Sequence, residues 1–298
     1  MSLTVVGSVA LDTVETPAGK NEEGLGGAAT YFALAAANYA HVHLIGIVGD
    51  DFPEEHVRLL EEKGIDLEGL ERAAGATFRW AGRYHDDVNV RDTLDTQLNV
   101  FEQFHPKLPA AASEAAYLFL GNIHPSLQLE VLEQTRARFV GLDTMNLWID
   151  IALDDLKAVL RRVDAVIIND SEVKELTGEG NLIRGARAVK ALGPRIVVVK
   201  KGEHGCLLFG EDGVFAAPAY PLDTVVDPTG AGDTFAGGFM GYLAQQEAVD
   251  NASLRRAVVH GSVVASFTCE AFGPDRLAQI DERAIAARYR AFQELAAF

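Results

Sequence analysis

Apolar residues along the chain gather in short runs that are rich in β-branched residues. Turn residues stand at both ends of these runs, and longer segments of helical periodicity lie between them. This alternation is typical of a mostly parallel sheet between two layers of helices. The expected strands are Leu3–Val6, Val42–Val48, Tyr117–Leu120, Phe139–Leu142, Ala165–Ile168 and Ile196–Val199. The expected helices include Ala28–Ala40, Glu54–Lys63, Gln128–Arg138 and Leu182–Leu192. The pattern predicts a three-layer α/β/α fold.

The region Thr77–Phe101 has a different pattern, in which apolar and polar residues alternate around a polar turn at Asp86-Asp87. Such alternation favours antiparallel strands that are exposed on one side. We interpret the region as a small β insertion on the α/β body, joined by part of Asp12–Leu25. The body would then comprise residues 1–11, 26–75 and 103–298, and the insertion residues 12–25 and 76–102.

Charge and length narrow the classes of function. The 298 residues include 26 Lys and Arg against 43 Asp and Glu, a formal net charge of −17. This charge repels phosphodiester backbones and acidic membranes, and no basic run compensates it. Two cysteines are too few for a disulfide framework, and neither a signal peptide nor an 18-residue apolar span is apparent. We expect a cytoplasmic protein that binds neither nucleic acid nor membranes.

The segment Val226–Phe239 carries the clearest chemical signal. Pro228 marks a turn, and small residues follow it where a helix over Phe235–Gln245 is expected to begin. Backbone N–H groups at such a helix start can stabilise a phosphoryl group. The amides concerned are those of Gly230, Ala231 and Gly232.

Asp233 falls in the first turn of that expected helix. Its carboxylate could accept the proton of a substrate hydroxyl while the neighbouring amides stabilise the transferring phosphoryl group. A Gly-x-Gly-Asp string taken alone is also explained by a tight turn and a capped helix. The residues around it decide between these interpretations.

The longer string Asp-x-x-Gly-Ala-Gly-Asp followed by Thr-Phe-x-Gly-Gly resembles the C-terminal signature of the ribokinase-like, or PfkB, carbohydrate kinases. The resemblance extends over nearly the whole chain, with Gly7, Asp12 and Gly26-Gly27 similar to the sugar-binding end and the β insertion similar to the lid. It implies a ribokinase-like fold and an ATP- and Mg²⁺-dependent kinase that phosphorylates a primary hydroxyl of a sugar or nucleoside. Asp233 would be the general base.

Two further motifs fit the nucleotide end of such an enzyme. Asn169-Asp170-Ser171-Glu172 is similar to the family's Asn-x-x-Glu motif, in which Glu172 would reach magnesium through water; the alternative is a capping box. The turn from Lys200 to Gly205, with Gly202 between them, resembles the nucleotide-binding turn; the alternative is a plain hairpin. Lys200 replaces a small hydroxyl residue, and its ammonium would compensate phosphate charge or be solvated.

The acceptor end shows departures from ribokinase. Asp12 offers acceptor oxygens for vicinal hydroxyls, and Gly26 and Gly27 leave room for a ring to approach the backbone. Tyr31 and Ala10 stand where ribokinase has residues that hold ribose, so strict ribose recognition is not expected. Tyr31 would stack on a base, pack against a sugar or belong to the core.

Asp227 and Thr229, with the loop Glu270–Gly273, match positions at which relatives bind a monovalent cation, so K⁺ is an open cofactor. The eight histidines show no His-x-x-x-His or His/Cys spacing of the zinc type, and no transition-metal site is expected.

The sequence also allows other classes of function. A nicotinamide enzyme is suggested by Gly24–Ala29, which matches Gly-x-Gly-x-x-Ala, but no strand directly precedes it. A non-catalytic sensor with a kinase fold is disfavoured by the intact Gly-Ala-Gly-Asp. No P-loop string occurs. A homodimer through the β insertion is open, because a one-sided apolar sheet needs cover.

Overall fold

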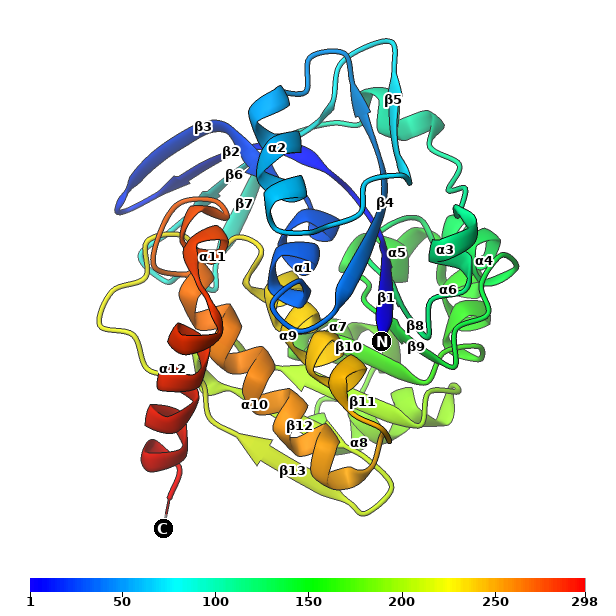
Figure 1. Ribbon diagram of the computed structural model, residues 1–298. Helices are drawn as coiled ribbons and strands as arrows, with labels where there is room; N and C mark the ends of the chain where they lie inside the picture. The colour runs from blue at the N-terminus through cyan, green and yellow to red at the C-terminus, as the bar shows by residue number, and fades with distance from the viewer. Residues whose placement is uncertain (298) are drawn as a thin grey trace.

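The computed structural model describes residues 1–297 and shows a large and a small sheet (Figure 1). The large sheet has the strand order β13-β12-β11-β10-β9-β8-β1-β4-β5. Strands β11 to β5 of this order run parallel, and β12 and β13 are antiparallel. The strands are β1 Ser2–Val6, β4 His41–Gly49, β5 Leu70–Ala73, β8 Tyr117–Leu120, β9 Phe139–Leu142, β10 Ala165–Asn169, β11 Ile196–Lys200, β12 Cys206–Phe209 and β13 Val214–Ala217. All the predicted strands are present, to within one residue at either end.

Helices cover both faces of the large sheet, as the sequence predicts (Figure 1). Alternate residues of the strands feed two separate cores; in β1, for example, Leu3 and Val5 belong to one and Val6 to the other. The first layer holds α1 Ala28–Ala36, α2 Glu54–Glu62, α9 Ala231–Gln245, α10 Asn251–Thr268, α11 Asp275–Gln279 and α12 Glu282–Leu295. The second holds α3 Ala110–Ser113, α4 Pro125–Leu132, α5 Asn146–Ile151, α6 Leu153–Leu160, α7 Asp170–Thr177 and α8 Leu182–Ala191.

Several helix boundaries differ from the predicted ones. Helix α1 ends at Ala36 because the Asn38 side chain donates to the carbonyls of Leu34 and Ala35. Helix α4 occupies Pro125–Leu132, earlier than the predicted Gln128–Arg138, because His124 caps its start and Pro125 suits the first turn.

The C-terminal part of the predicted Gln128–Arg138 helix is not helical. The Thr135 hydroxyl there accepts a bond from the amide of Ala137 at 3.1 Å. Local bonds of this kind compete with the helical ladder, and the helix therefore ends before them.

The small sheet has the order β3-β2-β6-β7 and stands at one end of the large sheet (Figure 1). Its strands are β2 Ala10–Thr16, β3 Gly19–Gly26, β6 Phe78–Tyr84 and β7 Arg91–Gln97. β2 pairs antiparallel with β3, and β6 with β7, whereas β2 and β6 are parallel. The antiparallel hairpin expected in Thr77–Phe101 is thus present, and the segment near the N-terminus joins it through a parallel pair. We call this four-stranded sheet the lid.

Two 3₁₀ turns complete the chain, η1 at Asn99–Gln103 and η2 at Gly202–His204. Within residues 1–297, no helix is long and apolar enough to cross a membrane. The carboxyl ends of all the parallel strands face one edge of the large sheet, and ligands of open α/β sheets bind at that edge.

Candidate active site

The site begins at the N-terminus of α9. Gly230 is the residue before this helix and has a φ of 74°, a left-handed conformation that glycine adopts without strain. A Cβ built at Gly230 would lie 2.3 Å from the ring of Tyr31, which is 2% exposed. The ring therefore packs against the turn, which is the core role among those that the sequence leaves open for Tyr31.

Helix α9 begins four residues before the predicted Phe235, because the Gly230 conformation already directs the chain into it. The amide of Ala231 donates to the carbonyl of Pro228 at 3.2 Å, and so closes the turn. Within residues 1–297, no acceptor bonds to the amides of Gly230 and Gly232. Of the predicted anion-binding amides, these two are free and that of Ala231 is already used.

Asp233 lies in the first turn of α9 and is partly exposed. Burial, and secondly the nearby carboxylate of Asp143, raise the pKa of its carboxyl to about 7. The positive charge of Lys200, its own backbone amide and Arg91 act in the opposite direction. A carboxyl with a pKa near neutrality can accept a proton at physiological pH, as a general base must.

Lys200 and Asp143 form an ion pair beside α9. The Nζ of Lys200 lies 3.4 Å from Oδ2 of Asp143, and both side chains are largely buried, with 18% and 8% exposed. Burial by itself lowers the pKa of Lys200, but the carboxylates of Asp143, Glu172 and Asp233 outweigh it and raise that pKa overall. The ammonium is therefore charged.

Lys200 also lies close to the free amides. A Cβ built at Gly232 would lie 3.0 Å from the Lys200 Nζ. Of the two roles that the sequence allows for Lys200, a solvated surface charge does not fit this position, and compensation of phosphate charge does.

Glu172 and Asn169 stand where β10 passes into α7. The Asn169 side chain accepts from the amide of Glu172 at 2.8 Å, and the Glu172 carboxylate accepts from the amide of Asn169 at 2.8 Å. This is the capping box that the sequence offers as an alternative. Burial and the charge of Asp143 also raise the pKa of Glu172 to about 7, against the opposing effect of Lys200. Glu172 thus caps a helix and belongs to the charged cluster.

Asp12 comes from lid strand β2 and is 7% exposed. Burial, together with the charges of Asp227 and Asp233, raises its pKa to about 7, against the opposing effect of the backbone amide of Gly27. A Cβ at Gly26 would lie 2.0 Å from Oδ2 of Asp12, so this side chain fills the space that glycine leaves. Asp12, Gly26 and Gly27 are thus together, and near Asp233.

Asp227 is 1% exposed and accepts two backbone bonds, from Thr229 at 2.8 Å and from Gly273 at 3.2 Å. The structure brings together the residues that the sequence groups as a cation site. No salt bridge within residues 1–297 neutralises Asp227, and its pKa is raised by burial, with the bonds from Thr229 and Gly273 opposing the rise.

The lid reaches both ends of this arrangement. The Thr229 hydroxyl donates to the Tyr84 hydroxyl at 3.3 Å, which joins β6 to the α9 turn. The side chain of Asn89, in the loop between β6 and β7, donates to Glu203 at 3.1 Å. Glu203 belongs to η2 of the predicted nucleotide-binding turn.

The turn itself links β11 to β12 as an antiparallel hairpin, with Lys200 opposite Cys206. Its glycines, Gly202 and Gly205, have φ values of 53° and 77°. The plain hairpin is therefore present. Lys200 is the last residue of its first strand and lies in the charged cluster with Asp143.

Three residues near the site are absent from the sequence prediction: Asp143, Tyr84 and Arg91. Asp143 had a usable signal, because a carboxylate directly after a buried strand falls at the carboxyl edge of a parallel sheet. Tyr84 and Arg91 had none, because the pairing of the lid strands places them.

The expectation that no strand directly precedes the string Gly24–Ala29 is wrong, because Gly24–Gly26 form the end of β3 and α1 begins at Ala28. That strand pairs antiparallel within the small sheet, however, and is not part of the parallel βαβ unit that a dinucleotide fingerprint requires.

Known proteins of similar sequence identify the family of the chain. The model of the pfkB family carbohydrate kinases matches residues 2–280. A cytidine kinase of Thermococcus kodakarensis is 32% identical over 248 residues, which cover 80% of this chain and 87% of that protein. A nucleoside kinase of Methanothermobacter thermautotrophicus is 27% identical over 260 residues, 82% of this chain and 78% of that protein.

Solved structures of related fold cover almost all of the chain. The Burkholderia thailandensis nucleoside kinase in complex with inosine superposes with a TM-score of 0.79 at 19% identity, over 97% of this chain and 98% of that one. A probable sugar kinase from Rhizobium etli gives a TM-score of 0.81 at 18% identity, over 98% of both chains. The ribokinase-like α/β fold with its separate small sheet is thereby confirmed. With a family model that matches nearly its whole length, the chain belongs to the pfkB family of carbohydrate kinases.

Proposed function

We propose that this kinase transfers the γ-phosphoryl group of ATP to the primary hydroxyl of a nucleoside, with a cytidine-type pyrimidine nucleoside as the first candidate. The observation that carries the reaction is the position of Asp233, with a pKa of about 7, beside the free amides of Gly230 and Gly232 and the ammonium of Lys200. A base, an anion-binding turn and a cation are the parts that phosphoryl transfer requires.

In this proposal, Asp233 accepts the proton of the acceptor hydroxyl while the hydroxyl oxygen bonds to the γ-phosphorus of ATP. The bond between the γ-phosphorus and the oxygen of the leaving ADP breaks. The negative charge of the transferring group is stabilised by the amides of Gly230 and Gly232 and by Lys200. The Asp143–Lys200 pair keeps the ammonium charged and in place.

The donor set also fits Mg²⁺, which prefers oxygen ligands and keeps several waters. Asp143 and Glu172 supply neighbouring carboxylates, and the charge of one raises the pKa of the other. These two residues would hold the ion, directly or through water, where it would neutralise the phosphates of ATP. Asn169 would orient Glu172 through their two mutual bonds.

A monovalent cation such as K⁺ fits the surroundings of Asp227. This buried carboxylate has backbone donors and no salt-bridge partner within residues 1–297, so a bound cation would compensate its charge. Thr229 and the loop at Gly273 would complete the ligand set.

The lid favours a nucleoside over a free sugar as acceptor. Phe78, Trp80, Gly82 and Tyr84 alternate along β6 and so share the face that Tyr84 turns toward the α9 turn. Trp80 pairs in register with Asp12 of β2, so an indole stands next to the carboxylate proposed to hold the acceptor hydroxyls. An aromatic face beside a hydroxyl-binding carboxylate suits a ligand made of a base and a sugar.

The lid contacts both the α9 turn and η2, and these contacts would exclude water that otherwise hydrolyses ATP. The edge strand β7 is exposed throughout, with Leu94 51% exposed, which supports a homodimer through the lid. Use of ATP is consistent with a cytoplasmic enzyme.

A panel of nucleosides and sugars, assayed with ATP and Mg²⁺ for production of ADP and phosphorylated acceptor, tests the function. We expect the highest kcat/KM for a pyrimidine nucleoside, and Asp233→Asn to lower kcat by about 10²–10⁴-fold with little change in KM. Asp223→Asn is the matched control, because Asp223 is exposed and outside the site. A preference for free sugars would overturn the acceptor class.

Near-normal turnover by Asp233→Asn would overturn the assignment of the base. Binding of nucleosides without any turnover across the panel would instead indicate a non-catalytic sensor.

A further inference from the structure

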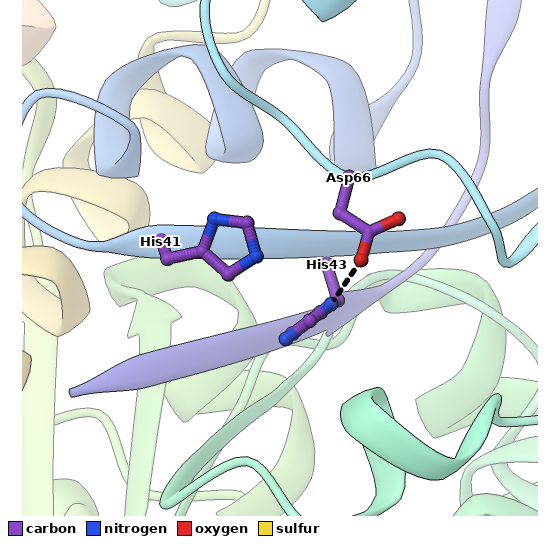
Figure 2. Close-up of side chains that lie close together, drawn as sticks. All are labelled: His41, His43 and Asp66. Atoms are coloured by element: carbon purple, nitrogen blue, oxygen red, sulfur yellow. Dashed lines mark hydrogen bonds and ion pairs between the residues drawn. The ribbon is translucent and has the colours of Figure 1, made fainter.

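A second cluster of chemically active side chains lies far from the site described above, at the opposite edge of the large sheet. It consists of His41, His43 and Asp66 (Figure 2). His41 and His43 stand at the amino end of β4, whereas the active site is at the carboxyl ends of the strands. Asp66 lies in the segment that leads from α2 to β5.

The strand geometry brings the two imidazoles together. Residues i and i+2 of a strand point to the same face, so the His-Val-His string presents both rings on one side of β4. Their centroids are 4.7 Å apart and their planes are nearly perpendicular, at 85°. His-x-His on a strand is the counterpart of His-x-x-x-His on a helix, so the absence of the helical spacing does not exclude this arrangement.

Asp66 is fixed beside them by the backbone. Its amide donates to the carbonyl of Val42 at 2.8 Å, its carbonyl accepts from Leu44 at 2.9 Å, and it forms an isolated parallel bridge with His43. The Asp66 Oδ2 lies 2.8 Å from Nδ1 of His43 (Figure 2). Two of the three side chains are thus held in place without any ligand.

One donor atom from each residue lies within 4.8 Å of the donor atoms of the other two. Ligands of a tetrahedral zinc ion, with bonds of about 2.0–2.1 Å, stand about 3.3 Å from one another. His43 is buried at 6% exposure, whereas His41 is exposed at the surface and free to rotate toward the pair. Metal binding would then require the His41 ring to turn toward the pair, and the His43–Asp66 pair to open slightly from 2.8 Å as zinc replaces its hydrogen bond.

The chemistry of the donors indicates the type of ion. Two imidazoles and one carboxylate suit Zn²⁺ and its first-row neighbours, whereas Mg²⁺ and Ca²⁺ select oxygen ligands. Three protein ligands leave a fourth position for water. We propose that His41, His43 and Asp66 form a zinc-binding site that ties the amino end of β4 to the segment before β5. This site is independent of the proposed kinase reaction.

The chain offers matched controls for this proposal. His105 pairs with Glu130 at 3.4 Å, and His85 with Asp92 at 2.8 Å, so both are surface histidines beside a carboxylate. Within residues 1–297, no third His, Cys, Asp or Glu side chain joins either pair in a possible metal-binding cluster. If a His–carboxylate pair alone bound zinc, these pairs would bind it too.

The test is a titration of the purified full-length protein with Zn²⁺, monitored by calorimetry, in a large excess of Mg²⁺, which competes with Zn²⁺ for the carboxylates of the active site. Absorption bands of bound Co²⁺ provide a second readout. We expect one zinc equivalent for the wild type and for His105→Ala. His41→Ala and Asp66→Asn should each lower the affinity by tenfold or more, on the order of the loss seen for lesser changes around metal sites.

His41→Ala removes an exposed side chain, so this variant is expected to keep the fold, which its melting temperature without metal will verify. At the same zinc concentration, the melting temperature of the wild type should rise more than that of His41→Ala. The proposal is overturned if the wild type binds no zinc under these conditions, or if His41→Ala binds zinc as tightly as His105→Ala does.

Discussion

Asp233 owes its proton affinity to its surroundings. An exposed aspartate titrates near pH 4, whereas burial and the charge of Asp143 raise the pKa of Asp233 to about 7. Lys200 limits this rise. The residue that would accept the proton is therefore tuned by the residues that would bind the phosphates.

This tuning predicts a pH dependence. Below its pKa Asp233 is protonated and cannot act as a base, so kcat/KM should rise tenfold per pH unit up to about pH 7 and level off above it. Steady-state rates between pH 5.5 and 9 measure this limb. Because Glu172 also has a pKa of about 7, the pH dependence of kcat/KM is to be measured for Glu172→Gln as well.

If the titration of Asp233 causes the rise of kcat/KM with pH, Glu172→Gln should show a rise of the same slope, even though its rates are lower. A flat profile in the wild type would contradict a role for Asp233 as base.

The residues of the site divide into two groups by how far a sequence can predict them. Asp233 and its glycines are contiguous, so the local chain determines their mutual positions and the string is recognisable. Asp143 is a single carboxylate in an unremarkable string, and only the order of the strands brings it to Lys200, 57 residues further along the chain. Tyr84 and Arg91 depend on the pairing of the lid, which no local pattern encodes.

At the scale of elements, α9 is held against its neighbours by close backbone contact. A Cβ built at Gly237 would lie 2.4 Å from the carbonyl oxygen of Phe32 in α1, and one at Gly238 would lie 3.1 Å from Gly261 in α10. Glycines at these positions let α9 approach both helices closely. The Gly-Gly pair that follows the Asp233 turn in the sequence is therefore a packing feature.

Gly237→Ala should destabilise the protein by about 1–3 kcal/mol, because the methyl group must displace backbone and not a mobile side chain. The higher helix propensity of alanine offsets only about 1 kcal/mol. Since α9 carries Asp233, kcat should fall as well. Urea unfolding and steady-state kinetics measure the two effects.

Gly180→Ala is the control, because a Cβ at Gly180 meets nothing within 4 Å. Equal stability of the two variants would contradict the packing role of Gly237.

Element types were more predictable than element ends. Strands are fixed by buried β-branched runs, so their predicted and observed limits agree. Helix ends depend on single side chains, such as Asn38 after α1 and His124 before α4, whose bonds no periodicity reveals. The early start of α9 depends on the left-handed conformation of Gly230.

At the scale of the whole molecule, the lid contacts two separate parts of the α/β body. Tyr84 contacts Thr229 at the α9 turn, and Asn89 contacts Glu203 in η2. Within the proposed function, a lid with both contacts covers the acceptor and the transferred group together.

Asn89→Ala removes the second contact and should raise the KM of the acceptor several-fold and increase ATP hydrolysis without acceptor, because water reaches the site more often. Release of inorganic phosphate in the absence of acceptor measures the second effect. Gln97→Ala is the control, because among the described residues 1–297 the Gln97 side chain bonds to Asp95 alone, which also belongs to the lid. The role of the lid contact would be refuted if the two variants behaved alike.

The glycine contacts of α9 have a consequence for how acceptor preference can change within such an enzyme. With the helix wedged between two others, mutation has little freedom to relocate the carboxylate at its tip. Residues of β2 and β6 belong to a separate sheet, and Tyr84 of β6 meets Thr229 in the turn that leads into that helix. Within the proposed function, a change of acceptor is therefore more readily achieved by substitutions in the lid strands than by substitutions around Asp233.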